Sequence, residues 1–242
     1  MKRTLFVASS LSAVGLTACG PVKQQLTDSL RGTLSSVEGL NYRLIGTHGM
    51  AKLYSEADIN HNYRVNGLDT PTDTRYARAY ADGTWAGYRL PIGGLVESPH
   101  VFTLPELKAM PRLTQITRHD CVEGWSVVGK YSGVVLSTVL AMAKPKPEAR
   151  FVVFRCFDKD QAGSEYYESL DLTQAVHPQT MLALELNDAP IDPDHGAPVR
   201  LRIPTQLGYK SAKWVRQIEL ASARPGTGGY WEDQGYEWYA GI

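Results

Sequence analysis

The most informative stretch of this chain reads Thr117-Arg118-His119-Asp120-Cys121-Val122-Glu123-Gly124-Trp125-Ser126. A structural cysteine usually lies inside an apolar run, as Cys156 does after Phe151-Val152-Val153-Phe154-Arg155. Cys121 instead follows Arg118 and His119, where a predicted strand over 113–117 leads into a loop. Cationic neighbours at such a junction favour a thiolate, the form that binds soft metals. From the residues alone, a ligand or nucleophile and a merely exposed thiol are equally good interpretations.

Three other segments accompany this loop. Upstream lies Tyr88-Arg89-Leu90-Pro91-Ile92-Gly93-Gly94-Leu95-Val96-Glu97-Ser98-Pro99, and downstream lie His195-Gly196-Ala197-Pro198-Val199-Arg200-Leu201 and Leu207-Gly208-Tyr209-Lys210-Ser211-Ala212-Lys213-Trp214. In order and spacing over about residues 58–222, the four segments resemble the sulfite oxidase superfamily. The nearest branch is that of periplasmic methionine-sulfoxide reductase catalytic subunits. Four motifs in register are far more specific than a lone cysteine.

The resemblance implies an α+β domain with the sulfite-oxidase-type molybdopterin-binding fold, in which mixed sheets carry short helices. The pattern agrees, because predicted strands outnumber helices and no regular βαβ units occur. Thr103-Leu104-Pro105-Glu106 predicts a helix that begins with a capping box. Tyr88–Val96 predicts a strand pair pinched at Gly93-Gly94, and Val134–Ala143 predicts a short helix.

The resemblance also implies a molybdenum-molybdopterin cofactor. In the superfamily, the two dithiolene sulfurs of one pyranopterin and the loop cysteine hold the metal. Carried over, Cys121 is the expected metal ligand, and Arg118 is expected beside it as a second catalytic residue. The cofactor then carries the redox chemistry, while the protein supplies one thiolate, orientation and charge.

A pyranopterin ends in a phosphate and presents polar edges, so its site needs cations and amide groups. Two segments supply cationic and hydroxyl groups at His195, Arg200, Lys210, Ser211 and Lys213. Arg suits bidentate contacts with an oxyanion, and Lys acts as a point charge. The alternative is a solvated basic turn. A looser match early in the domain adds Asn62, Arg64 and Asn66, for which a polar surface loop is the alternative.

The N-terminus predicts export. Lys2 and Arg3 precede an apolar run, Leu5–Leu16, which is too short for a stable membrane anchor. The run ends in Leu16-Thr17-Ala18-Cys19, which resembles a bacterial lipobox with Cys19 as the lipidation site. An ordinary signal peptide is the alternative. We therefore expect a signal over 1–19, a tether over 20–41 and an oxidoreductase domain over 42–242, in a periplasmic protein that reaches the membrane only through its lipid.

Charge and motifs limit the partners. Lys plus Arg and Asp plus Glu both number 25 in 242 residues, which removes any general case for a nucleic-acid partner. No haem-attachment C-x-x-C-H occurs, so a separate cytochrome or membrane haem protein is the expected electron partner. The dimerisation domain of sulfite oxidases does not follow, and a monomer is expected.

The predicted function is two-electron oxygen-atom transfer on a small or protein-bound substrate. A sulfite-oxidising enzyme is one alternative. Sulfite is a dianion that needs several converging arginines, and only Arg118 and Arg155 are available for that role. The other alternative is a lipoprotein that kept the fold as a non-catalytic binding module.

Overall fold

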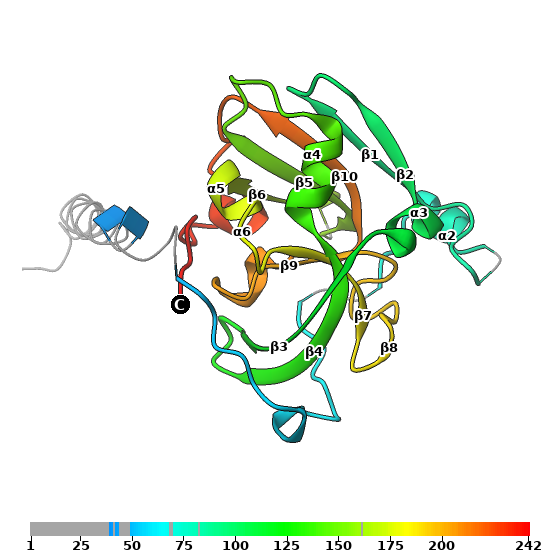
Figure 1. Ribbon diagram of the computed structural model, residues 1–242, viewed down its shortest axis with the longest axis vertical. Coiled ribbons are helices and arrows are strands. Elements are labelled where there is room, and N and C mark those ends of the chain that lie inside the picture. The colour runs from blue at the N-terminus through cyan, green and yellow to red at the C-terminus, as the bar shows by residue number, and fades with distance from the viewer. Residues whose placement is uncertain (1–38, 41, 44–48, 68–69, 82, 161) are drawn as a thin grey trace, which may run out of the picture. The chain divides into compact units, whose positions relative to one another are not determined.

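The computed structural model describes residues 39–40, 42–43, 49–67, 70–81, 83–160 and 162–242 (Figure 1). The chain divides into two units, Met1–Leu40 and Asn41–Ile242, and every element described below belongs to the second. The predicted signal over 1–19, with Cys19, and almost all of the predicted tether lie outside the described residues. No helix in the described part combines the length and the apolar character that crossing a membrane requires.

Two sheets form the domain. The first contains β1 (Arg89–Gly94), β2 (His100–Thr103), β5 (Phe151–Lys159), β6 (Glu165–Asp171) and β10 (Val215–Ala221) in the order β2-β1-β10-β5-β6. The second contains β3 (Arg112–Asp120), β4 (Ser126–Val135), β7 (Met181–Leu186), β8 (Ala189–Pro190) and β9 (Arg200–Arg202). Its order is β3-β4-β7-β8, and β9 also pairs with β7. The β1–β10 pair is parallel and its neighbours are antiparallel, so the prediction of mixed sheets is confirmed.

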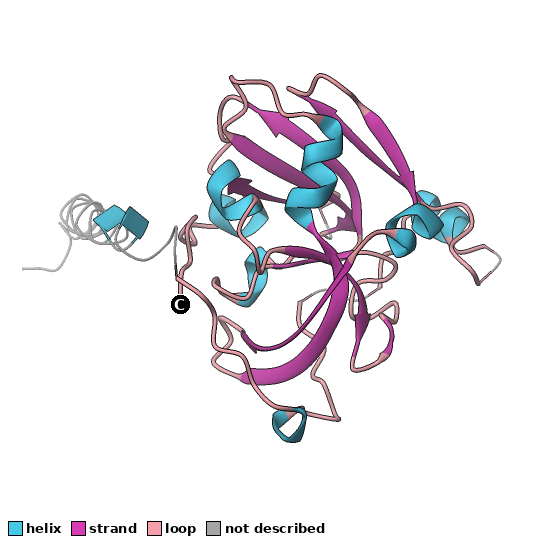
Figure 2. Ribbon diagram, in the orientation of Figure 1, coloured by secondary structure: helices cyan, strands magenta, loops and turns pink. Residues whose placement is uncertain are grey.

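The helices are short (Figure 2). They are η2 (Glu56–Asp58), α2 (Thr74–Ala79), α3 (Leu104–Ala109), α4 (Leu136–Ala143), α5 (Leu172–Ala175), η3 (Gly208–Lys210) and α6 (Tyr230–Asp233). The capping box that begins α3 is confirmed: the Thr103 hydroxyl accepts from Glu106 N, and the Glu106 carboxylate accepts from Thr103 N at 2.7 Å. Helix α4 begins two residues later than predicted, because Val134 and Val135 continue β4 and pair with β7.

The strand pair predicted at Gly93-Gly94 is wrong. A single strand, β1, runs through both glycines and pairs with β10. Gly94 has a φ of +79°, and a Cβ there would lie 2.2 Å from the carbonyl oxygen of Leu220. Here the glycine allows two backbones to approach closely, which is the other common meaning of glycine in a strand.

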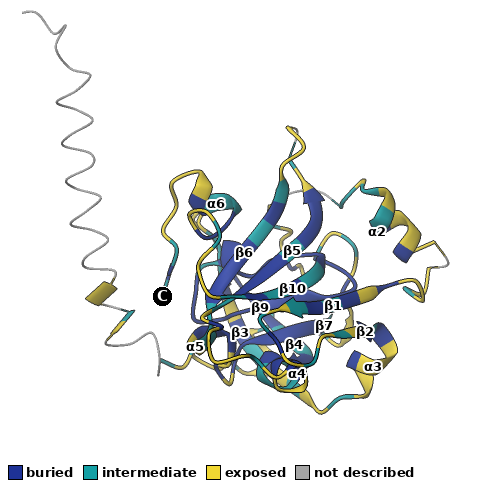
Figure 3. Cartoon of the chain, turned by 90° about the horizontal axis from the view of Figure 1, so that it is seen from above, coloured by how far each residue is buried: buried dark blue, intermediate teal, exposed yellow. Residues whose placement is uncertain are grey.

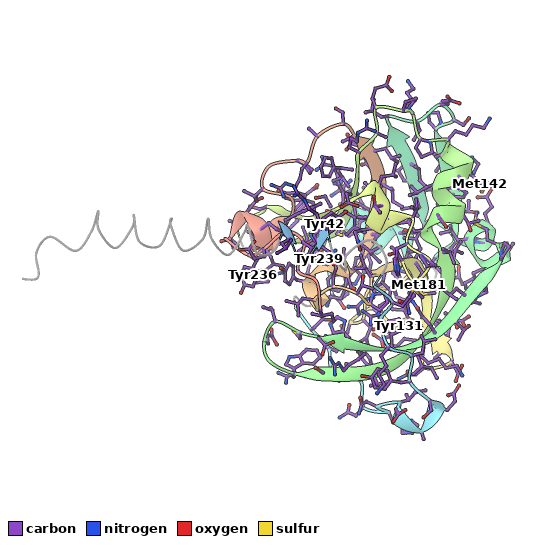
Figure 4. The ribbon with its side chains drawn as sticks, turned by 60° about the vertical axis from the view of Figure 1, so that its left-hand side comes forward. Tyr42, Tyr131, Met142, Met181, Tyr236 and Tyr239 are labelled. Carbon is purple, nitrogen blue, oxygen red and sulfur yellow. The ribbon has the colours of Figure 1, made fainter. Side chains whose placement is uncertain are left out.

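Strand β7 separates two hydrophobic cores and is buried on both faces (Figure 3). Leu182 and Leu184 point into the larger core. This core contains side chains of the first sheet and of the helices. Met181 and Ala183 point the other way, into a smaller core that includes Tyr131. Figure 4 labels Tyr131 and Met181 at this smaller core. Strand β9 pairs with β7, and its side chains alternate between the same two cores as those of β7. Leu201 therefore lies in the larger core.

Candidate functional site

Cys121 lies in the loop that joins β3 to β4. Its N–H donates to the carbonyl oxygen of Trp125 at 2.9 Å, and its own carbonyl accepts from Gly124 N at 3.0 Å. Gly124 has a φ of +86°, which the tight loop requires. Cys121 is partly buried and, like the fully buried Cys156, is a free thiol. A rigid hairpin therefore holds the thiol in one place.

The charges around Cys121 differ from the sequence expectation. Arg118 is half exposed, and its Nε forms an ion pair with Asp120 Oδ1 at 2.7 Å. His119 is buried, and burial together with the charges of Arg200 and Arg202 lowers its pKa well below the usual value. Burial raises the pKa of Cys121. The expectation that Arg118 and His119 favour a thiolate is therefore wrong, and the geometry of the loop is what distinguishes Cys121.

A pocket with about 540 Å³ of empty space, partly open to solvent, lies beside the thiol. Four of the predicted site residues line it: Asn66, Cys121, Ser211 and Lys213. The remaining lining includes aromatic side chains from three elements, namely Tyr166, Tyr209 and Trp231. Two acidic residues, Glu123 and Asp158, complete the polar part of the lining. The lining thus combines basic and amide-bearing residues, called the basic side below, with aromatic and acidic residues, called the aromatic side.

Two arginines lie behind the basic side. Arg200 and Arg202 are both fully buried, and their alternation along β9 turns them away from Leu201 and the larger core. Arg200 donates to the carbonyl oxygen of His195 at 3.0 Å and to Asn66 Oδ1 at 3.3 Å. Arg202 donates to the carbonyl oxygen of Arg118 at 2.6 Å and, at 3.5 Å, to the hydroxyl of the pocket residue Ser211.

Neither guanidinium has a counter-ion in the described part of the chain. Within the described residues, no carboxylate forms an ion pair with Arg200 or Arg202, and the Nε of each has no hydrogen-bond partner. Burial lowers the pKa of Arg202, which is the direction expected where the charged form is disfavoured. A buried charge without a partner costs several kcal/mol, roughly. Two buried charges of the same sign without a carboxylate partner would be stabilised by a nearby anion.

Lys213 adds a third cation on the same side of the pocket. Its ammonium donates to the carbonyl oxygens of Asn66 at 2.7 Å and Asp194 at 3.0 Å, and lies 4.0 Å from the ring centre of Trp214. Gly196 makes room for it, because a Cβ there would lie 2.9 Å from the Cβ of Lys213. Lys213 and Arg200 therefore share Asn66 as a hydrogen-bond partner.

The structure does not bring Lys210 to the pocket. Its ammonium is fully buried and contacts Glu168 Oε2 at 2.5 Å and the carboxylate of Glu232. Burial raises the pKa of Glu168 well above its usual value. Lys210 occupies the last position of η3, and the turn that directs Ser211 towards the pocket directs Lys210 away from it. Two carboxylates already neutralise this lysine, so a phosphate has no vacant contact there.

The other predicted site residues do not line the pocket beside Cys121. Arg118 lines a different hollow, together with Tyr54 and Pro204. Asn62 is exposed, and the exposed Arg64 lies 4.8 Å from the ring centre of Trp125. The His195 ring is held by Asp192 at 2.8 Å and faces the carbonyl oxygen of Tyr63 at 3.1 Å. His195 therefore supports the segment around the arginine pair.

The cluster of Glu168, Lys210 and Glu232 supports the aromatic side of the pocket. Each member is one or two residues from one of the aromatic lining residues, Tyr166, Tyr209 and Trp231. The Tyr166 hydroxyl also donates to the carbonyl oxygen of Tyr209 at 2.7 Å. Because the cluster joins β6, η3 and α6, it aligns the three aromatic side chains that those elements carry.

The C-terminal segment packs against the residues that lead into η3, the element that carries the pocket residues Gly208 and Tyr209. Leu207 N donates to the carbonyl oxygen of Ala240 at 2.8 Å, and Ile242 N donates to that of Thr205 at 3.1 Å. Tyr239 contacts Tyr42 with ring centres 4.8 Å apart, and Figure 4 labels both residues. This segment, which also provides Trp231, therefore frames the pocket as well as covering the core.

Several site residues were absent from the sequence prediction. Arg202 had a signal, because Arg-Leu-Arg in a short strand places both arginines on one face. Asp158, Tyr166 and Trp231 had none, because they come from β5, β6 and α6, which only the folded chain brings together.

We expect Lys210→Met to lower the free energy of unfolding by about 3–5 kcal/mol at neutral pH, because it leaves two buried carboxyl groups without a cation. Without the ammonium, the folded-state pKa of Glu168 would lie even further above its unfolded value, so the loss should grow as pH rises from about 4. Urea unfolding of the variant and of the wild type at pH 5 and pH 8 measures this loss of stability.

The matched control is Lys159→Met. Lys159 also lies near two carboxylates, at 3.7 and 3.8 Å, but its side chain is 41% exposed. Such pairs contribute about 0–1 kcal/mol. Equal losses in the two variants would contradict the role given to the buried cluster.

Comparison with known proteins identifies the family. Residues 77–231 match the family model described as the oxidoreductase molybdopterin binding domain. A protein of Azospira oryzae, provisionally named protein-methionine-sulfoxide reductase subunit YedZ1, is 35% identical over 99% of this chain and 87% of its own length. The protein-methionine-sulfoxide reductase catalytic subunit MsrP of Campylobacter jejuni is 32% identical over 78% of this chain and 67% of its own.

The solved structure of the sulfane dehydrogenase SoxCD from Paracoccus pantotrophus has the same fold. The match has a TM-score of 0.52 and 25% identity, and it covers 73% of this chain and 46% of that one. The extent of the family match and the 35% identity over nearly the whole chain agree with the fold. This chain belongs to the oxidoreductase molybdopterin-binding family and is a molybdopterin-dependent oxidoreductase of the sulfite-oxidase type.

Proposed function

We propose that this enzyme is exported and reduces methionine sulfoxide by two-electron oxygen-atom transfer. The observation that carries the proposal is the composition of the pocket beside Cys121. Its lining places Tyr166, Trp231 and Asp158 in the same pocket as the amide of Asn66 and the ammonium of Lys213. A sulfoxide is neutral and carries alkyl groups that aromatic rings can contact. The names of two similar proteins, from Azospira oryzae and Campylobacter jejuni, point to the same substrate class.

The residues present fit the cofactor. Arg200 and Arg202 would bind its phosphate, since their unpartnered Nε atoms and missing counter-ions call for an oxyanion. Asn66, Ser211 and Lys213 would contact its polar edges from the pocket lining. Cys121 would ligate the metal through its thiolate, giving up its proton on binding. The cofactor supplies a molybdenum centre that changes oxidation state by two electrons.

The same geometry disfavours sulfite as the substrate. Arg118 is paired with Asp120 outside the pocket. Arg155, the other arginine considered, is paired with Glu219 at 3.4 Å on a partly exposed part of β5. Neither side chain is available to a dianion beside Cys121. We therefore assign no substrate role to Arg118.

The reaction consumes electrons from elsewhere. A sulfoxide, two electrons and two protons yield a thioether and one water. We propose that a separate cytochrome or membrane haem protein donates the electrons to a monomeric enzyme. A binding module without catalysis would need no metal, so elemental analysis of protein matured in its own host separates the two functions. A protein without molybdenum would contradict the proposal.

Cys121→Ser should fold, still bind the pterin through its other contacts, and lose turnover with a reduced dye as electron donor. Serine is a harder and much less acidic donor than a thiolate, so the paramagnetic Mo(V) signal should also change. Steady-state kinetics and electron paramagnetic resonance measure the two effects.

Cys156→Ser is the control, because Cys156 is fully buried on β5 outside the pocket. A hydroxyl in that apolar position should cost about 1–3 kcal/mol of stability and leave the metal signal intact. Loss of the signal in Cys156→Ser, with full turnover in Cys121→Ser, would overturn the assignment of the metal ligand.

We also propose that the protein is periplasmic and held to a membrane by lipid on Cys19. The support is the apolar run that ends in Leu16-Thr17-Ala18-Cys19. Mass spectrometry of the mature protein should find a diacylated N-terminal cysteine, and Cys19→Ala should release the protein from membranes. An unmodified N-terminus produced by cleavage elsewhere would refute the anchor.

A further inference from the structure

Asp158 lies between two hollows near the end of β5. It lines the pocket that contains Cys121. It also lines an outer hollow, formed by residues of 70–74 and 157–163 together with Tyr230. The residue is only 5% exposed, and its Oδ1 has no hydrogen-bond partner anywhere in the described part of the chain. A buried polar atom without a partner needs an explanation, because leaving it unpaired costs stability.

The charged residues around Asp158 are Glu123 and Lys213 in the pocket, and Asp73, Lys159 and Asp160 in the outer hollow. Tyr166 of β6, Tyr230 of α6 and Cys156 of the same strand are uncharged titratable groups within its electrostatic range. Lys213 is the cation that favours the carboxylate form. Burial has the larger effect and raises the pKa of Asp158 to about 7. At neutral pH the carboxyl group therefore exists in both protonation states, which suits an acid that must be recharged in every cycle.

We propose that Asp158 transfers the protons that sulfoxide reduction consumes, taking them from water in the outer hollow and releasing them in the pocket beside Cys121. The proposal rests on the proposed function. In each turnover the sulfur–oxygen bond breaks, two electrons arrive from the external carrier, and two protons convert the departing oxygen to water. Asp158 passes one proton at a time and is reprotonated from the outer hollow.

The direction of the pH dependence follows from this role. The acid form of Asp158 predominates below about pH 7 and disappears as pH rises through that value. The kcat for sulfoxide reduction should therefore be high at pH 6 and fall between pH 6.5 and 8, roughly.

The test compares the cofactor-loaded, full-length wild type with Asp158→Asn, Asp158→Glu and Asp160→Asn. Methionine sulfoxide is the substrate and a chemically reduced viologen is the electron donor. Asp160 is the matched control, because it lines the outer hollow but not the pocket, and its carboxylate accepts from Ser164 N at 2.8 Å. Molybdenum content should be the same in all four proteins.

Asp158→Asn should lower kcat at pH 6 at least tenfold and make it independent of pH, because general acid catalysis typically contributes about 10²–10⁴-fold. Asp158→Glu should restore part of the rate and the pH dependence. Asp160→Asn should match the wild type.

Difference infrared spectroscopy gives a readout besides activity. Between pH 5 and pH 9, the wild type and Asp160→Asn should show a protonated carboxyl band that titrates near pH 7, and Asp158→Asn should lack it. A wild-type kcat–pH profile in Asp158→Asn, or the same band in that variant, would overturn the proposal. A loaded wild type that shows the band but reduces no sulfoxide would refute the substrate assignment, and with it the role of Asp158.

Discussion

Two guanidinium groups buried without a counter-ion are the feature on which the site depends. Arg200 and Arg202 are fully buried, and in the described residues they donate to carbonyl, amide and hydroxyl oxygens rather than to carboxylates. Such oxygens satisfy hydrogen bonds but leave two positive charges in a medium of low dielectric constant. Lys210 shows the contrasting solution, because its charge is equally buried but lies between two glutamates. We propose that an anion from outside the chain completes the arginine pair, and the cofactor's phosphate fits that requirement.

Different elements of the fold carry the different parts of the site around this pair. Strand β9 alternates between a leucine in the larger core and two arginines facing the site, so the packing that stabilises the domain also holds the charges in place. The β3–β4 loop carries Cys121, and β6, η3 and α6 carry the aromatic side of the pocket. The buried cluster around Lys210 ties those three elements together. In the proposed mechanism, cofactor binding, metal ligation and substrate contact therefore come from separate parts of the chain.

Much of this arrangement could be predicted from the sequence. Four motifs in order predicted the family and the mixed sheets, and local rules predicted the capping box of α3. The structure brings Cys121, Asn66, Ser211 and Lys213 to one pocket. It directs Lys210 and Arg118 elsewhere, because motif matching assigns a residue to a segment and only strand register or turn geometry decides where its side chain points. Asp158 and Trp231 could not be found, since they reach the pocket from strands and helices distant in sequence.

The central claim is that the buried arginine pair binds the cofactor's phosphate. The most direct test measures the thermal midpoints of Arg202→Met and of the wild type, each in the cofactor-free and the loaded form. Methionine removes the charge at similar length. The cofactor-free variant should be at least as stable as the cofactor-free wild type, because an uncompensated buried charge has gone. Loading should raise the midpoint of the variant less than that of the wild type, because one phosphate contact is missing. An equal fall in midpoint in both forms would show that Arg202 serves only the fold, which would contradict the account.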